Sequence, residues 1–185
     1  MKKTTLTATL ATVILLTACG GGGSDNKMEA HPFEGTPPIS EALKNEYLSA
    51  INNARAVGRY CGEQWFDPAP PVAWNNALYS ASYEHSQDMA NTGYFEHEGS
   101  NTVYDWTAQV QNLGRGSTAE ERAMNNGANA GMENIARLGG DFSNTNRAVT
   151  GWLNSTGHCV AIMSVKKYIG MSHVGAYWTL DFSDN

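Results

Sequence analysis

The stretch WLNSTGHC, residues 152–159, carries the side chains on which the fold of this 185-residue chain depends. Trp152 and Leu153 end a predicted helix that Asn144 can cap, so both apolar side chains should face the core. Gly157 interrupts the helical pattern, and His158 follows it at the end of an element, where a side chain can point into a cleft. Cys159 comes next and can join this point to a distant part of the chain.

The cysteines of the chain fall into two kinds. Cys19 belongs to the predicted lipid anchor, which leaves Cys61 and Cys159 as an even pair in an exported domain. We predict that these two form a disulfide closing a loop of roughly 100 residues, worth up to about 4.7 kcal/mol in the chain-entropy model. Two buried free thiols are the alternative.

The leader has the pattern of a bacterial lipoprotein signal. Lys2 and Lys3 precede an apolar run from Leu6 to Leu16 that is too short to span a bilayer, and small residues then lead into Cys19. We therefore predict a signal peptide over 1–18 and lipid on Cys19, in an oxidising compartment. An ordinary secretory leader with a chance cysteine is the alternative. Gly20 favours the outer membrane of a bacterial envelope, with the domain either periplasmic or surface-exposed.

The rest of the chain is predicted to be a flexible tether followed by one domain. Residues 19–39 are rich in Gly, Pro and polar side chains, and residues 40–185 have the size of one domain with a single core. The full chain has a net charge of -6, and removal of Lys2 and Lys3 leaves 10 basic against 18 acidic residues, about -8. An acidic surface repels phosphate backbones, so we expect no nucleic-acid partner.

Periodicity along residues 40–185 predicts helices first and strands late. The expected fold is α+β, with helices packed on a small antiparallel sheet. Ser40 and Gly93 are the expected start of the first helix and end of the second. The expected helices cover 41–57, 75–91, 105–113, 119–126 and a segment after Asn144, and the expected strands cover 132–138, 168–174 and 177–182.

Three segments concentrate proton-active side chains beside glycines, namely 94–99 (YFEHEG), 131–136 (GMENIA) and 152–159. Their candidates are His97, Glu133 and His158. Two imidazoles and a carboxylate are a plausible set for a divalent cation, with zinc favoured by nitrogen ligands. The spacing of about 25 to 36 residues is weak support. A helix-capping His97, a Glu133 that binds backbone N–H groups and a loop His158 remain open as alternatives.

Two further side chains are assigned structural roles. His85 shares the apolar face of its helix with Leu78 and Met89, which favours a core histidine over a ligand. Ser155 lies three residues before His158, but no Gly-x-Ser-x-Gly elbow surrounds it, so capping or turn formation is favoured over nucleophilic catalysis.

Taken together in chain order, these segments resemble the CAP superfamily (cysteine-rich secretory, antigen-five and pathogenesis-related-one proteins), in its bacterial secreted branch. The resemblance covers roughly Leu43 to Phe182. It is carried by Asn52-x-x-Arg55, Pro71-x-x-Trp74-Asn75, His85-Ser86-x-Asp88-Met89-Ala90, Phe95-x-His97, Glu133-Asn134-Ile135-Ala136, Trp152-Leu153-x-Ser155-x-Gly157-His158-Cys159 and Tyr177-Trp178-Thr179.

The resemblance implies an α-β-α sandwich with a central cleft holding two histidines and two acidic residues, where some members bind a divalent metal. His97 matches the first histidine, Glu133 the glutamate and His158 the second histidine. The second acidic residue would fall near Ser155 and is missing. The pairing of Cys61 with Cys159 also recurs in bacterial relatives.

The chain departs from the family pattern in two places. The glycine before Glu133 is displaced by one position, to Gly131, and residues 99–130 follow the usual pattern poorly, so one wall of the cleft should differ. Within the matched part, we expect the amide of Asn134 to orient the cleft and Arg55 to pair with an acidic residue of the core.

The sequence thus predicts a membrane-anchored extracytoplasmic CAP domain that binds a lipid, cell-wall or protein ligand in a His/Glu cleft without catalysis. The alternative is a hydrolase or peptidase in which His97 and His158 hold Zn²⁺ or another divalent cation and Glu133 acts as ligand or general base. A third possibility is a structural envelope protein with a vestigial cleft. No cofactor is firmly indicated.

Overall fold

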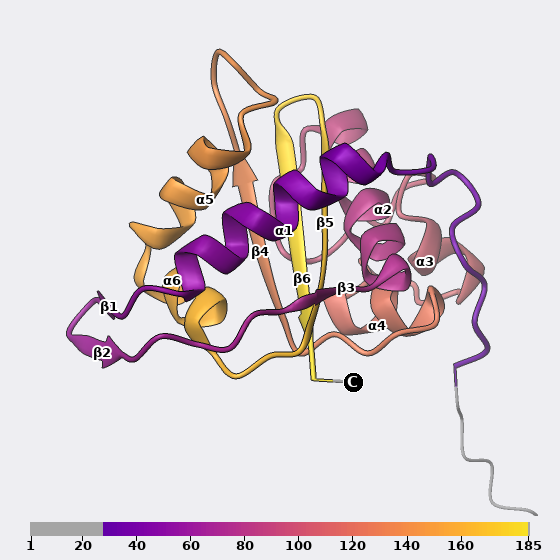
Figure 1. Ribbon diagram of the computed structural model, residues 1–185. Helices are drawn as coiled ribbons and strands as arrows, with labels where there is room; N and C mark the ends of the chain where they lie inside the picture. The colour runs from indigo at the N-terminus through magenta and orange to yellow at the C-terminus, as the bar shows by residue number, and fades with distance from the viewer. Residues whose placement is uncertain (1–27, 185) are drawn as a thin grey trace, which may run out of the picture.

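The computed structural model describes residues 28–184, which contain six helices and six strands joined by loops (Figure 1). The leader and Cys19 lie outside these residues. The helices are α1 (Glu41–Arg55), α2 (Asn76–Thr92), α3 (Trp106–Val110), α4 (Ala119–Asn125), α5 (Thr145–Leu153) and α6 (Thr156–Met163). The strands are β1 (Arg59–Cys61), β2 (Gln64–Phe66), β3 (Ala73–Trp74), β4 (Met132–Arg137), β5 (Tyr168–Val174) and β6 (Tyr177–Ser183).

The central sheet has the strand order β3-β5-β6-β4. The predicted hairpin is confirmed, with β5 and β6 antiparallel and Gly175 in the turn at a positive φ of 54°. β4 pairs antiparallel with β6 at one edge, and this register places Glu133 opposite Asp181. β3, a parallel strand of two residues, was not predicted and pairs only with the start of β5.

The two faces of the sheet differ in polarity because β6 alternates strictly. Trp178, Leu180 and Phe182 belong to the main apolar cluster, which they share with side chains of α1, α5 and α6. The residues between them face α2, whose Ser82 hydroxyl donates to Asp181 Oδ2 at 2.8 Å. Helices cover both faces of the sheet, as expected for an α-β-α sandwich (Figure 1). The interface with α1, α5 and α6 is apolar, and the interface with α2 is polar.

Helix α2 lies unusually close to the sheet. A Cβ atom on Gly170 of β5 would lie 2.1 Å from backbone atoms of Leu78 and Tyr79, so only glycine permits this approach. The close contact fixes the polar interface between α2 and β6 described above.

The predicted helix ends are mostly confirmed. The Ser40 side chain accepts a hydrogen bond from the Leu43 amide, and Gly93 ends α2 in the left-handed conformation. Helix α6 was missed, because Gly157 was interpreted as the end of helical structure. The chain instead restarts a helix at Thr156, so His158 lies in the first turn of α6 and not in a loop.

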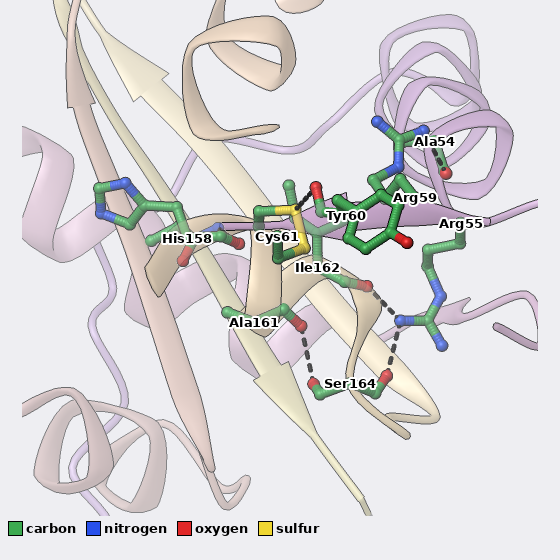
Figure 2. The surroundings of a disulfide bond; sticks show 11 residues. Ala54, Arg55, Arg59, Tyr60, Cys61, His158, Ala161, Ile162 and Ser164 are labelled. Atoms are coloured by element: carbon green, nitrogen blue, oxygen red, sulfur yellow. Dashed lines mark hydrogen bonds between the residues drawn. A yellow bond between two sulfur atoms is a disulfide. The ribbon is translucent and has the colours of Figure 1, made fainter. Parts of the chain in front are cut away.

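The expectation that Arg55 pairs with a core acid is wrong. Its buried guanidinium donates to backbone carbonyl oxygens, among them those of Pro70, Ile162 and Ser164, as Figure 2 shows for the last two. Ile162 and Ser164 lie at the end of α6, where the last carbonyls have no helical partner and carry partial negative charge. These carbonyls take the role that we assigned to a carboxylate.

The predicted disulfide between Cys61 and Cys159 is present, with a sequence separation of 98 residues. It joins the short β1–β2 hairpin to α6, and both cysteines are buried (Figure 2). Its position next to His158 in the sequence links it to the candidate site.

The described part of the predicted tether packs against the domain. The Asn125 side chain accepts from the backbone N–H of His31 at 3.0 Å and donates to its carbonyl at 2.8 Å, and Asn126 accepts from the N–H of Phe33 at 2.9 Å. The Phe33 ring contacts Trp106. Residues 31–33 are therefore held by side chains of α3 and of the end of α4. No helix within residues 28–184 has the length and apolar character needed to cross a membrane.

Candidate functional site

His97 and Glu133 meet at the outer edge of the sheet. Glu133 lies on the edge strand β4, and His97 lies in the loop after α2. The Nδ1 atom of His97 is 2.8 Å from Oε1 of Glu133, and the His97 side chain is 51% exposed while that of Glu133 is 3% exposed. Since a carboxylate can only accept, Nδ1 carries the proton and the other ring nitrogen, Nε2, remains for a ligand.

Arg122 completes this arrangement and was not predicted. Its guanidinium donates through Nη2 to Glu133 Oε2 at 2.7 Å and to the His97 carbonyl at 2.9 Å, and through Nη1 to the Ser117 carbonyl. The side chain is 1% exposed. A single buried cation from α4 therefore holds both the carboxylate and the backbone of the histidine loop.

These contacts set the protonation states of Glu133 and His97. Burial alone raises the pKa of Glu133, but the Arg122 guanidinium, His85 and the His97 hydrogen bond outweigh burial and lower the pKa to about 2. The hydrogen bond to Glu133 raises the pKa of His97 above its ordinary value, against the desolvation of the ring. Glu133 is thus a permanent anion at neutral pH, and it favours the protonated form of His97.

His158 reaches the same edge from the other helix layer. Its ring centroid lies 6.4 Å from that of His97. The Asn134 amide donates to the His158 carbonyl at 3.1 Å, so Asn134 acts on the backbone of α6 and not on the cleft directly. Figure 2 shows the ring pointing away from the disulfide. Burial and the nearby His97 lower the pKa of His158, so this imidazole is neutral at neutral pH.

His85 lies beneath the pair. It is buried, as predicted, and its Nε2 donates to the Glu96 carbonyl at 3.0 Å. The same nitrogen is 4.0 Å from Glu133 Oε2, so the His85 ring is a direct neighbour of the Glu133 carboxylate as well as part of the core. Burial lowers the pKa of His85 to about 4. The ring is therefore neutral at neutral pH, and the contact with Glu133 is not an ion pair there.

The histidine loop is held against Gly116 and Ser117, which lie between α3 and α4. The Gly99 amide donates to the Ser117 carbonyl at 2.8 Å, and the buried Asp105 carboxylate accepts from the Ser117 amide at 3.0 Å. A Cβ on Gly116 would lie 1.9 Å from the Gly99 carbonyl oxygen, so glycine is required for this approach. The segment between α3 and α4 thus supports the loop that carries His97.

Comparisons with known proteins match this fold. The model of the cysteine-rich secretory protein family, CAP, matches residues 48–180. The chain belongs to this family. A sequence search of curated proteins finds no match.

Two solved structures share the CAP fold with this chain. An extracellular protein of Bacillus anthracis that contains an SCP domain has a TM-score of 0.55 and 19% identity, over 81% of this chain and 45% of that chain. An outer surface protein of Borrelia burgdorferi has a TM-score of 0.52 and 15% identity, over 80% of this chain and 97% of that chain. At these identities the likeness shows the fold alone.

The predicted zinc ligands of this CAP domain are not arranged as a three-residue metal set. Both oxygens of Glu133 already accept hydrogen bonds, from His97 and from the Arg122 guanidinium. Within residues 28–184 no group of three His, Cys, Asp or Glu side chains is placed to hold one ion. Because the Glu133 carboxylate is already paired with the Arg122 guanidinium, we propose no metal-dependent reaction in which Glu133 takes part.

Ser155 is at the start of α6, but the capping role predicted for its side chain is not confirmed. It occupies the N-cap position, although its side chain makes no capping hydrogen bond, and its carbonyl accepts from the Cys159 amide at 2.8 Å. The cation Arg122 approaches Glu133 from α4.

Replacing Glu133 with glutamine is expected to lower the pKa of His97, because the amide can still accept from Nδ1 but no longer attracts a proton. In the wild type, the raised pKa makes His97 stabilising below pH 6.5, its ordinary value, and this contribution is lost as pH rises through the raised value. An NMR titration of the imidazole signals measures the change. His31, which is exposed and distant in sequence, is the internal control; an unchanged His97 titration in Glu133→Gln would contradict the assigned hydrogen bond.

Proposed function

We propose that this protein is a membrane-anchored extracytoplasmic binding domain whose ligand docks at the β4 edge between His97 and His158. The observation that carries this proposal is that both carboxylate oxygens of Glu133 are already hydrogen-bonded. One accepts from His97 at 2.8 Å and the other from Arg122 at 2.7 Å. A carboxylate with such a low pKa is a weak base. Its role is to orient and charge His97, not to remove a proton from a substrate.

The proposed ligand carries an acidic group. The raised pKa of His97 favours its protonated form and the lowered pKa of His158 favours its neutral form, and the two ring centroids are 6.4 Å apart. Hydrogen bonds from a cationic donor to a phosphate or carboxylate are the strong ones. Tyr94 and Phe95, both exposed, precede His97 and offer apolar surface for the rest of the ligand. An anionic lipid fits both features.

The anchor and the location are part of the proposal. The predicted lipid on Cys19 would place the domain at a bacterial envelope membrane. Gly20, which follows the lipidated cysteine, favours the outer membrane. The extracellular protein from Bacillus anthracis and the outer surface protein from Borrelia burgdorferi support an extracytoplasmic location. This chain covers 45% of the first of these proteins, so nothing about the activity of that whole protein is assumed.

Co-sedimentation with lipid vesicles tests the proposal. We expect the protein to bind phosphatidylglycerol vesicles better than phosphatidylcholine vesicles, and the double variant His97→Ala/His158→Ala to bind the former about tenfold more weakly, the loss expected for one charge-assisted hydrogen bond. His31→Ala is the matched control, because His31 is exposed and only its backbone makes the hydrogen bonds described above.

Equal binding by the wild type and the double variant would refute a site at the β4 edge. Binding to purified cell-wall sacculi in place of vesicles, with the same dependence on the two histidines, would keep the site and change the ligand class.

A further inference from the structure

A second hollow lies at the sheet edge opposite the His97 site. β3 pairs only with Tyr168 and Ile169, so from Gly170 onward β5 has no described strand on that side. A cavity of about 300 Å³ is found there, at the lower end of the volumes of small-molecule sites. Its lining comes from four places in the chain: the segment 37–40 before α1, then α1, α2 and β5.

The walls of this cavity are flat rings held in place by hydrogen bonds. The hydroxyl of Tyr47 is 2.8 Å from Nδ1 of His173, whose ring stacks on Trp178 with 4.3 Å between the centroids. The hydroxyl of Tyr79 donates to the Pro37 carbonyl at 3.1 Å, so the proline wall is fixed to α2. A site with fixed walls loses little conformational entropy when a ligand binds.

One residue of the lining, Ser172, has a buried side-chain hydroxyl without a protein partner among the described residues. Ser172 of β5 is 2% exposed, and its Oγ has no hydrogen-bond partner within residues 28–184. Leaving a buried hydroxyl unpaired is unfavourable. A ligand group that reaches Ser172 would remove this penalty, which gives the cavity a built-in preference for a molecule with one hydrogen-bonding group.

The rest of the lining disfavours ionic ligands, because its described residues have no permanently charged side chain. None of the described residues that line the cavity is Asp, Glu, Lys or Arg. An ion would therefore be desolvated without a partner of opposite charge. Flat tyrosine and proline side chains favour offset stacking with a planar ring.

We propose that this cavity binds a small neutral aromatic molecule whose single hydroxyl or N–H group pairs with Ser172. The site is separate from the His97 site and does not depend on the function proposed for it, because the two lie at opposite edges of the sheet.

Titration with 4-methylphenol, followed by NMR signals of the protein, tests this proposal. We expect saturable shifts for Tyr79 and Tyr83, and about fivefold weaker binding to Ser172→Ala, the loss of one neutral hydrogen bond. Ser172→Ala should fold normally, since the hydroxyl has no protein partner to lose. Ser49→Ala, which removes an exposed hydroxyl from α1, is the matched control and should bind like the wild type.

Two other probes and two other variants sharpen the outcome. Cyclohexanol keeps the hydroxyl without the flat ring and 4-methylbenzoate adds a charge, so both should bind at least about tenfold more weakly. Leu43→Trp, which fills the cavity from α1, should abolish binding, and His97→Ala/His158→Ala should leave it unchanged. The proposal is overturned by the absence of saturable binding, by equal affinity in Ser172→Ala and wild type, or by loss of binding in the histidine variant.

Discussion

Replacing Arg122 with methionine is expected to lower the free energy of unfolding by about 3 to 5 kcal/mol, the usual cost of removing one partner from a buried ion pair. Methionine keeps much of the apolar stem, so the loss reflects the guanidinium. Its removal leaves Glu133, with a side chain only 3% exposed, without the cation that holds it at 2.7 Å. Urea unfolding at neutral pH, followed by circular dichroism, measures the change.

The matched control is Arg115→Met. Arg115 lies just before α4 and pairs with Glu121 in the first turn of that helix. The Arg115 side chain is 55% exposed, so solvent replaces the lost contact. Little change in stability is expected there. Equal effects of the two substitutions would mean that the buried position of Arg122 has no special energetic role.

The pH dependence of the Arg122 variant should be opposite in sign to that of a normal paired carboxylate. In the wild type, the lowered pKa of Glu133 gives stability that is present above the ordinary value of 4.5 and is lost as pH falls toward 2. Without the cation, burial dominates and raises the pKa of Glu133. The variant then loses stability as pH rises from 4.5 through this raised value, so its deficit relative to the wild type should shrink in acid.

A double variant separates the charge from the packing. Arg122→Met/Glu133→Leu removes both ions, so it should be more stable than Arg122→Met alone. A double variant at least as unstable as the single variant would show that Arg122 acts through its hydrogen bonds to the His97 and Ser117 carbonyls, and not through Glu133.

The parts of the fold that could be predicted have strong local signals. Helix α1 has an apolar stripe and a Ser40 cap, α2 ends at Gly93, and the hairpin alternates in polarity around Gly175. β3 and α6 had no such signal. β3 has two residues and depends on its partner strand, and Gly157 in α6 concealed a helix that the disulfide and the core hold in place.

The candidate site could be predicted only in part, for a related reason. His97 and Glu133 were first grouped by residue type, and the family resemblance then placed their distant segments in one cleft. The structure does bring them into contact. Arg122 was missed because an arginine on a short helix usually faces solvent. One signal was available: residues 119–126 contain few large apolar side chains, so the buried face of that helix had to be polar.

Removing the disulfide, by replacing Cys61 and Cys159 with alanine, is expected to cost about 2 to 5 kcal/mol of stability. The two cysteines are separated by 98 residues, so the bridge restricts a large part of the unfolded chain. Urea unfolding of the double variant measures the loss. Each cysteine is buried, so the single variants also leave a buried thiol, and the double variant gives the cleaner value.

The same variant tests whether the bridge positions His158. The bridge fixes α6 next to His158, while the Asn134 amide holds the His158 carbonyl from β4 at 3.1 Å. If the bridge positions the ring, the double cysteine variant should show a changed His158 titration and weaker vesicle binding while still folded. Asn134→Ala, which removes the second tether and keeps the bridge, is the comparison. A destabilised variant whose His158 titration and vesicle binding match the wild type would assign the bridge to stability alone, because Asn134 would then suffice to hold the histidine.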